Sequence, residues 1–256
     1  MGLTSCSDFL NVDRYFRDQQ STERIFSDKD YTLQWLSFCY SRLQGDNLEV
    51  GHSDVCPFNF SDDQVFNERG DRFAKFKRGE YLNSTGGQNA WKWSYDGIYQ
   101  ASILLNELYE NEDLTPEEVT DVRGQARFLR AYFYFNLVRQ YGDVPFIDHF
   151  LSADESNTLS RTPAKDIFDY IISECDDIKD LIIEDYANLP ADVVLPSESP
   201  ETGRVNKATV LALKARAALY AASPLFNTDN NPELWHRAAT CLLYTSDAAD
   251  DLTRVD

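Results

Sequence analysis

The sequence has no long apolar run and few residues of the kinds that bind metals. Its 256 residues include 3 histidines, 5 cysteines and 1 methionine. No stretch reaches the roughly 18 consecutive apolar residues that a membrane-spanning helix needs. The cysteines form no closely spaced pair, five of them cannot all pair, and the histidines are far apart. We therefore expect neither a disulfide framework nor a zinc site.

Positive charge is also scarce. Lysine and arginine together number 24, aspartate and glutamate 43, and the formal net charge is −19. Nucleic acid binding depends on clustered cations, and so does electrostatic attraction to a membrane surface. We therefore predict no nucleic acid partner and no charged membrane patch. Aromatic residues are abundant instead, with 14 tyrosines, 16 phenylalanines and 4 tryptophans, which favours an aromatic-rich core.

Motifs that carry catalysis are missing as well. The sequence contains no nucleophile elbow, zinc-protease motif, phosphate-binding loop or dinucleotide fingerprint. Paired acids at Asp62-Asp63 and Asp176-Asp177 could serve a glycosidase, and the acidic stretch 62–71 could offer oxygen ligands to calcium. Adjacent acids are far more often a solvated surface. We predict a protein that is not an enzyme and that uses no cofactor or metal.

What the sequence does contain is helical periodicity, strongest between Thr115 and Gly142. Thr115, Pro116 and Glu118 form a capping box with proline at the first helical position. Apolar residues then recur in steps of three and four, and further aromatics widen this face until the second half must be buried almost all round. Gly142 is placed to end the helix. Gly124 costs helix stability, which predicts a neighbouring helix packed close against it.

Five further helices are expected. They span about 27–43, with a capping box at Ser27–Asp30, and about 89–110; another starts at Thr162-Pro163, one follows Asn206, and one follows Asn231-Pro232. The helix after Pro163 should bury Ile167, Ile171, Cys175, Ile178 and Ile182. The helix after Asn206 should pack through Ala208, Leu211, Ala212, Ala215, Leu219 and Ala222. Antiparallel pairs with small contact residues predict an all-α, tetratricopeptide-like stack with long irregular loops, the longest over 45–88.

Several motifs resemble those of one known family. Residues 124–135 (Gly-Gln-Ala-Arg-Phe-Leu-Arg-Ala-Tyr-Phe-Tyr-Phe) and 141–145 (Tyr-Gly-Asp-Val-Pro) resemble the signature of SusD/RagB proteins, the glycan-binding outer-membrane lipoproteins of Bacteroidetes. Trp91-x3-Tyr95-x2-Ile98, Arg161-Thr-Pro and Gly203-Arg-Val-Asn-Lys-Ala agree in order. The resemblance covers roughly residues 6–240. Because family members are about twice as long, these residues resemble an incomplete N-terminal helical domain.

The resemblance implies an anchor, a location and a partner. Leu3-Thr-Ser-Cys6 is similar to a lipobox, so Cys6 is the expected lipidation site and residues 1–5 the remnant of a signal peptide. The family is surface-exposed on the outer membrane, is attached only through its lipid, and passes oligosaccharides to a SusC-like TonB-dependent transporter. Residues 241–256 resemble translated sequencing adapter, so we expect a non-native tail after Thr240. Before it, the last helix should place Trp235 and Ala239 inward, with its pattern broken at Thr245.

The candidate ligand site lies at the start of the helix at about 89. Trp91 is expected in the core, and a helix turns Trp93 about 200° away from it. Trp93, with the amides of Asn89 and Gln88 beside it, is placed to stack on a sugar ring. The competing interpretation packs Trp93 under segment 45–88. A second possible function is a helical-repeat scaffold for protein partners, and burial of both tryptophans would favour it.

Overall fold

The computed structural model describes residues 26–43, 90–108, 113–149, 151, 155, 158–183 and 203–253. In these ranges the chain forms α2 (Lys29–Tyr40), α4 (Ala90–Glu107), α5 (Pro116–Tyr141), α7 (Ala164–Ile178), α8 (Lys207–Ala222) and α9 (Pro232–Thr253). The described residues contain no strand beyond one isolated antiparallel bridge between Val144 and Thr162. The all-α prediction is confirmed. None of the described helices has the length and apolarity that crossing a bilayer requires.

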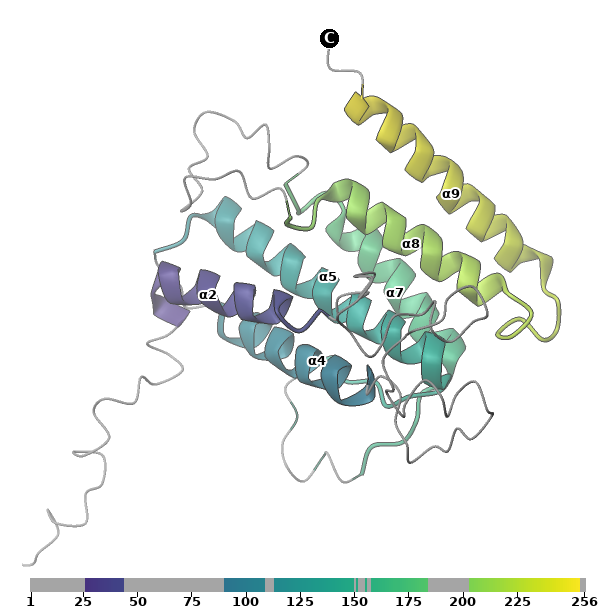
Figure 1. Ribbon diagram of the computed structural model, residues 1–256, viewed down its shortest axis with the longest axis horizontal. Helices are drawn as coiled ribbons and strands as arrows, with labels where there is room; N and C mark the ends of the chain where they lie inside the picture. Colours follow the sequence, from purple (N-terminus) through teal and green to yellow (C-terminus); the bar gives the residue numbers. More distant parts are fainter. Residues whose placement is uncertain are drawn as a thin grey trace, which may run out of the picture.

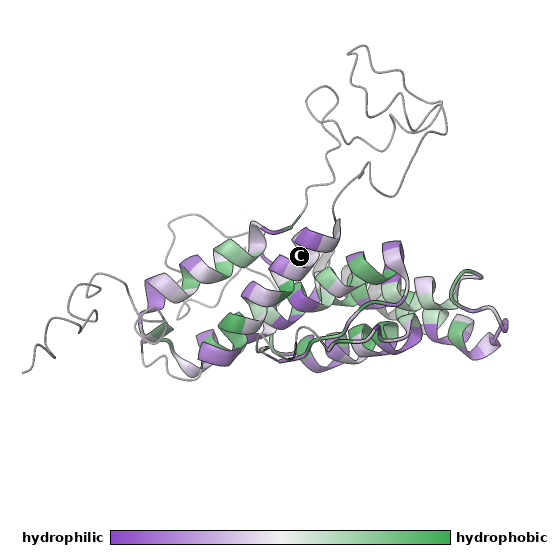
Figure 2. Cartoon of the chain, turned by 90° about the horizontal axis from the view of Figure 1, so that it is seen from below, coloured by the Kyte–Doolittle hydropathy of each residue, from purple (hydrophilic) through white to green (hydrophobic). Residues whose placement is uncertain are grey.

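The helices form a stack in which neighbours in sequence mostly lie side by side, and α5 lies near its centre (Figure 1). Helix α5 packs against α4 on one side and α7 on the other, α2 lies across α4 and α5, and α8 and α9 extend the stack beyond α7. Each helix therefore contacts mainly its neighbours in sequence, as in tetratricopeptide arrays. The described helices carry both hydrophobic and hydrophilic residues (Figure 2), as expected of helices that bury only part of their surface.

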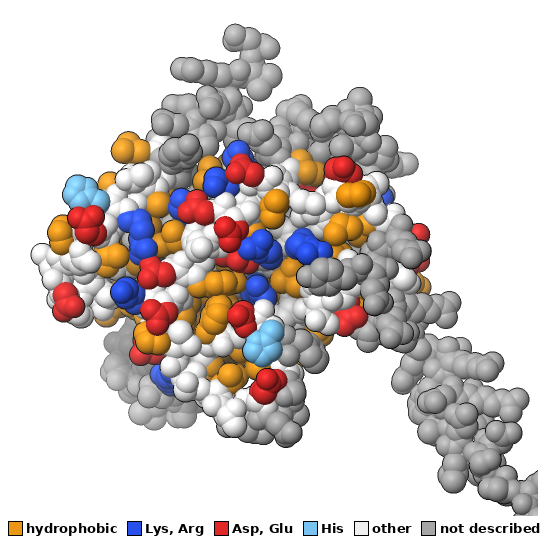
Figure 3. Space-filling model, turned by 180° about the vertical axis from the view of Figure 1, so that it is seen from behind, with side chains coloured by type: hydrophobic (Ala, Val, Ile, Leu, Met, Phe, Trp, Pro, Cys, Tyr) orange, Lys and Arg blue, Asp and Glu red, His pale blue; other side chains and the backbone are white. Residues whose placement is uncertain are grey.

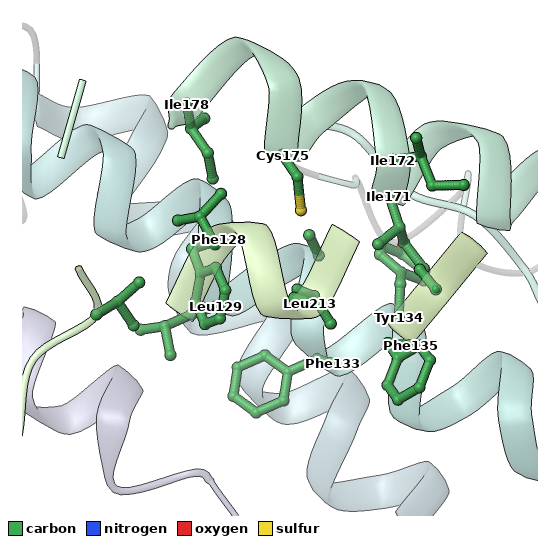
Figure 4. Packing of buried hydrophobic residues seen from close by; sticks show 14 of the residues in the cluster. Phe128, Leu129, Phe133, Tyr134, Phe135, Ile171, Ile172, Cys175, Ile178 and Leu213 are labelled. Carbon is green, nitrogen blue, oxygen red and sulfur yellow. The ribbon is translucent and has the colours of Figure 1, made fainter. Parts of the chain in front are cut away.

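Helix α5 has the ends and the burial that its sequence predicts. The Thr115 hydroxyl accepts from the Glu118 N–H at 3.2 Å, and a Glu118 carboxylate oxygen accepts from the Thr115 N–H at 3.0 Å. Gly142 ends the helix at φ +67°, a conformation that costs glycine little. Along the second half, Phe133, Tyr134 and Phe135 are at most 1% exposed although they point in different directions. Figure 4 shows these side chains in one cluster with Ile171 and Cys175 of α7 and Leu213 of α8.

Two glycines mark close approaches of α5 to other parts of the chain. A methyl group at Gly97 of α4 would lie 2.4 Å from the Phe133 ring, so α4 sits against α5 at this point. A methyl group at Gly124 would lie 2.7 Å from Ile182. Ile182 belongs to the turn after α7, not to the helix we expected as the neighbour of Gly124. Close packing was predicted correctly at Gly124, and its partner is corrected.

The other helix starts confirm one predicted cap and correct two. Asn206 caps α8 by accepting from the Thr209 N–H at 3.0 Å, as predicted. Helix α2 is capped by Asp28, which accepts from the Tyr31 N–H, instead of by Ser27 one residue earlier. Thr162 does not cap α7. Its place is taken by Asp143, whose Oδ1 accepts from the Ala164 N–H at 2.8 Å.

The segment after α5 is fixed by tyrosines from two helices. Tyr134 of α5 accepts from the Ile147 N–H at 2.6 Å and donates to the Ile147 carbonyl at 2.9 Å. Tyr95 of α4 donates to the Pro145 carbonyl at 2.7 Å. The same segment pairs with residue 162, where the Thr162 N–H donates to the Val144 carbonyl at 2.9 Å. The motifs at 141–145 and 161–163 therefore lie side by side and together place the start of α7.

The predicted inner face is right for α7 and partly wrong for α8 and α9. All five residues predicted for the inner face of α7, Ile167, Ile171, Cys175, Ile178 and Ile182, are buried, but the helix ends at Ile178 and Ile182 lies in the turn after it. In α8, Leu211, Ala215 and Ala222 are buried, but Ala212 and Leu219 are exposed and Ala208 is intermediate, since the buried set is Val210, Leu211, Leu213, Ala215, Ala217, Ala218, Ala221 and Ala222. In α9, Trp235 and Ala239 face outward, and Ala238 and Cys241 are buried. Seven of the 16 residues of α8 are alanine, which leaves its apolar face ambiguous in sequence and explains the errors there.

The C-terminal part of α9 is a further correction. We expected the α9 pattern to break at Thr245, yet the helix continues to Thr253. Its continuation does not test whether residues 241–256 are native, so the boundary after Thr240 stays a prediction. Cys6, residues 1–5, the irregular segment 45–88 and the paired acids Asp62-Asp63 lie outside the described residues.

A buried polar chain connects the beginning of the described fold to its later part. The Tyr40 hydroxyl of α2 donates to Gln125 Oε1 at 2.8 Å and accepts from the Val205 N–H at 3.0 Å. Gln125 Nε2 donates to Asp121 Oδ2 at 2.5 Å, and Asp121 Oδ1 accepts from the Ile183 N–H at 3.1 Å. Gln125 is fully buried, so this network satisfies polar groups that would be costly alone. Burial raises the pKa of Tyr40 to about 12.

Candidate ligand-binding site

Trp93 stands on the outer side of α4, near its N-terminus. Its side chain is 42% exposed, whereas Trp91 packs partly buried against the core. The Trp91 ring lies 5.0 Å from the Tyr95 ring and 5.2 Å from the Tyr141 ring, and the Trp91 N–H donates to the Tyr141 hydroxyl at 3.2 Å. The two tryptophans thus have the separate environments that their spacing predicts.

Trp93 belongs to a group that we call the Trp93 cluster, made of Phe38, Arg42, Trp93 and Asp96. The Arg42 guanidinium carbon lies 4.1 Å from the centre of the Phe38 ring and 5.8 Å from that of Trp93. Arg42 Nε is 3.2 Å from Asp96 Oδ2. This Nε forms no hydrogen bond, so its contact with Asp96 is an ion pair only. Phe38 is 40% exposed, which leaves two partly open rings around one cation.

Two helices that are distant in sequence build this cluster. Phe38 lies near the end of α2 and Arg42 in the turn that follows this helix. Trp93 and Asp96 are three residues apart on α4, so these two share one helix face. Trp35 holds the helices together, since its indole N–H donates to the Gln100 carbonyl of α4 at 3.2 Å. Its ring also lies 5.2 Å from buried Phe26. The packing of α2 on α4 therefore fixes the cluster.

The cluster combines a stacking surface with hydrogen-bonding groups. An aromatic face can cover the C–H side of a sugar ring, guanidinium N–H groups donate to hydroxyls, and a carboxylate accepts from them. Sequence reasoning identified Trp93 but missed Phe38, Arg42 and Asp96. The i, i+4 spacing of Phe38 and Arg42 was visible, but nothing in the sequence showed that α2 packs on this part of α4. Gln88 and Asn89 lie outside the described residues.

The other candidate residues in the described part of the chain are possible metal ligands and the paired acids Asp176-Asp177. Among described residues, no group of three or more histidine, cysteine or acidic side chains could hold a metal ion. Asp176 is paired with Lys214 at 2.6 Å, and Asp177 lies 3.5 Å from Arg127. Figure 3 shows such acidic and basic side chains interspersed on one face of the molecule. Asp176-Asp177 is therefore part of a charged surface, as expected.

Comparison with known proteins identifies the family. A SusD-like family model, described as starch-binding and associating with the outer membrane, matches residues 9–219. The chain belongs to the SusD-like family. SusD-like protein P25 of Formosa agariphila is 28% identical over 128 residues, which are 50% of this chain and 22% of that protein. Starch-binding protein SusD of Bacteroides thetaiotaomicron is 31% identical over 136 residues, 53% of this chain and 21% of that protein.

Solved structures of SusD-like proteins share this fold. Surface glycan-binding protein A from Bacteroides uniformis matches with a TM-score of 0.64 and 19% identity, over 86% of this chain and 46% of that one. A laminarin-binding SusD-like protein matches with a TM-score of 0.62 and 19% identity, over 81% of this chain and 43% of that one. The matched part therefore spans less than half the length of these SusD-like structures, and at this identity the likeness shows the fold alone.

Proposed function

We propose that this SusD-like protein binds oligosaccharides at the outer surface of the cell and delivers them to a TonB-dependent transporter. Family membership over residues 9–219 supports the class of ligand, and the exposed ring of Trp93 beside Arg42 and Asp96 carries the proposal for the site. Gln88 and Asn89, which directly precede α4 in the sequence, complete the proposed ligand residues. The two related structures described as glycan-binding and laminarin-binding are consistent with this proposal.

The environments of the two tryptophans favour glycan binding over a pure protein scaffold. Trp91 contributes to packing, but Trp93 leaves nearly half of its surface in water. Burial of a large aromatic side chain is worth about 1.5–3 kcal/mol, so an exposed tryptophan forgoes stability that burial would give. A ligand that covers the ring recovers part of this free energy. Phe38 and Trp93 both lie near Arg42 and are both partly exposed, so a sugar could contact two rings and one cation together.

Affinity for soluble glycans tests this site. Starch oligosaccharides and laminarin are the first probes, because relatives are named for binding them. In a full-length protein, Trp93→Ala should weaken binding at least about tenfold, or about 1.4 kcal/mol, with little change in melting temperature. Trp235→Ala is a matched control, since Trp235 has the same exposed fraction of 42% on another helix. A large fall in stability with unchanged affinity would place Trp93 in the core and refute the assignment.

The anchor and the partner need separate experiments. With the complete signal peptide present, Cys6 should become labelled by fatty acid and the protein should sediment with membranes, whereas Cys6→Ser should be released. Unchanged membrane attachment of that variant would refute lipidation at Cys6. Co-purification of the full-length protein with a SusC-like transporter in mild detergent tests delivery. Glycan binding without any co-purification would support a free-standing binding protein instead.

A further inference from the structure

A second surface feature lies where the C-terminal ends of α5 and α8 meet the start of α9 (Figure 1). It is a groove of about 220 Å³ with walls that include Arg139, Leu219, Tyr220, Leu225 and Trp235. The sequence predicted that Leu219 and Trp235 pack inward, and both do the opposite. We call it the α8–α9 groove. It shares no residue with the Trp93 cluster.

The rim of the groove is apolar and open. Leu225 is 73% exposed, Trp235 42% and Leu219 40%. Few polar atoms remain for a ligand, because the neighbouring Ser223 hydroxyl already donates to the Tyr220 carbonyl at 2.7 Å. A sugar needs hydrogen-bonding groups around its edge, and two leucines and a tryptophan do not supply them. Exposed apolar side chains clustered in this way are typical of protein–protein contacts.

Two arginines add positive charge to this apolar surface. The guanidinium carbons of Arg139 and Arg216 lie 5.9 Å and 5.4 Å from the centre of the Phe135 ring, and that of Arg216 is 6.0 Å from Tyr220. Each arginine makes cation–π contacts of this kind, and neither forms an ion pair with another described residue. Arg127 and Arg237, by contrast, each hold a carboxylate within 3 Å. In a chain of net charge −19, two such cations beside one groove stand out.

We propose that the α8–α9 groove docks a protein segment that presents an apolar side chain next to a carboxylate. The apolar side chain lies against Trp235 and Leu219, and the carboxylate pairs with Arg139. An arginine already held near an aromatic ring loses less freedom than a mobile one when it forms a bidentate pair. Aromatic residues and arginine are also the residue types that contribute most at protein interfaces. The groove and its protein partner differ from the Trp93 cluster and its glycan. Failure of glycan binding at Trp93 would therefore leave the docking proposal unaffected.

Two fluorescein-labelled peptides test the proposal against the full chain. The first is a 12-residue amphipathic helix with leucine and phenylalanine on one face and glutamates flanking them, and the second replaces every glutamate with the uncharged isostere glutamine. Fluorescence anisotropy at about 50 mM salt should show at least tenfold tighter binding of the acidic peptide. Trp235→Ala should weaken that binding at least tenfold, and Arg139→Glu should remove the preference for the acidic peptide. Arg139→Lys, which keeps the charge, should retain it.

Trp93→Ala is the matched control and should bind the acidic peptide like the parent protein. Equal affinity for both peptides, or acidic-peptide binding that survives both Trp235→Ala and Arg139→Glu, would overturn the proposal. Absence of binding at millimolar peptide would overturn it as well. A dimer that forms without peptide and is lost in Trp235→Ala would assign the groove to a second copy of the chain instead. Laminarin binding that is lost in Trp235→Ala would assign it to a glycan.

Discussion

Asp143 Oδ1 accepts a hydrogen bond of 2.8 Å from the backbone N–H of Ala164, the first residue of α7. The residue before α7 is Pro163, whose side chain cannot cap a helix, so a residue 21 positions earlier does so. Asp143 belongs to the Tyr-Gly-Asp-Val-Pro motif at the end of α5. One carboxylate therefore links the end of one helix to the beginning of the next.

Removing this carboxylate should destabilise the protein. We expect Asp143→Ala to lower the free energy of unfolding by about 0.5–2 kcal/mol, the usual cost of losing an N-terminal cap. Asp143→Asn retains an acceptor oxygen and should lose much less. Urea denaturation followed by circular dichroism measures both variants. Equal losses would show that the negative charge, not the hydrogen bond to Ala164, is what matters.

Gly97 should not tolerate a methyl group. In an exposed helix, glycine to alanine gains about 1 kcal/mol, but here the new methyl would lie 2.4 Å from the Phe133 ring. Overpacking of this kind costs about 1–3 kcal/mol. Gly97→Ala should therefore lower the midpoint of urea denaturation. In a double-mutant cycle, the same substitution should be less harmful in a Phe133→Leu background, and strict additivity would show that the ring is not the obstacle.

Glu118 should make stability depend on pH. Partial burial raises its pKa, but hydrogen bonds from Lys29 and the Thr115 N–H outweigh this, and the net pKa is below 4.5. A carboxyl with a lowered folded pKa stabilises the fold above its unfolded pKa, and this contribution is lost as pH falls through the folded value. Glu118→Gln should therefore be less stable than the parent at pH 7, with the difference shrinking below about pH 4.5. A difference unchanged between pH 7 and pH 3 would contradict this assignment.

Two cysteines should resist alkylation in the native protein. Cys39 and Cys175 are fully buried, and burial raises the pKa of each thiol to about 12. Thiolates are the reactive form, so iodoacetamide at pH 8 should leave both residues unmodified until urea unfolds the chain. Mass spectrometry of tryptic peptides identifies the modified sites. Rapid native labelling of Cys39 would show that the α2 packing opens readily.

The sequence predicted helices well where their periodicity was strong and their ends had local caps. The α5 capping box, the Asn206 cap and the buried isoleucines of α7 all follow from spacing. Prediction of caps and buried faces from the sequence failed where the contact that decides them is distant in the chain. Asp143 caps α7 across 21 residues, and the inward face of α8 depends on neighbours that its alanine-rich pattern does not specify.

The same limit applies to the candidate site. Trp93 was found because it falls off the packing face of its own helix, a local property. Phe38 and Arg42 were missed because they reach Trp93 only through the packing of α2 on α4. The non-native character of residues 241–256 stays a prediction that no contact in the structure tests. Sequencing of genomic DNA across Thr240 checks it, and a native reading frame through Thr245 would show it to be wrong.

The Tyr40 hydroxyl has a consequence for how this protein unfolds. In an ideal repeat array, each unit contacts only its neighbours and segments can open one at a time. Tyr40 departs from that rule, because its hydrogen bond to the Val205 N–H joins positions 165 residues apart. Detaching α2 from the stack, or pulling away the segment that leads into α8, must break this bond. The Val205 amide proton should therefore exchange with solvent deuterium as slowly as the most protected amides of α5, and the helices from α2 to α8 should melt as one cooperative unit.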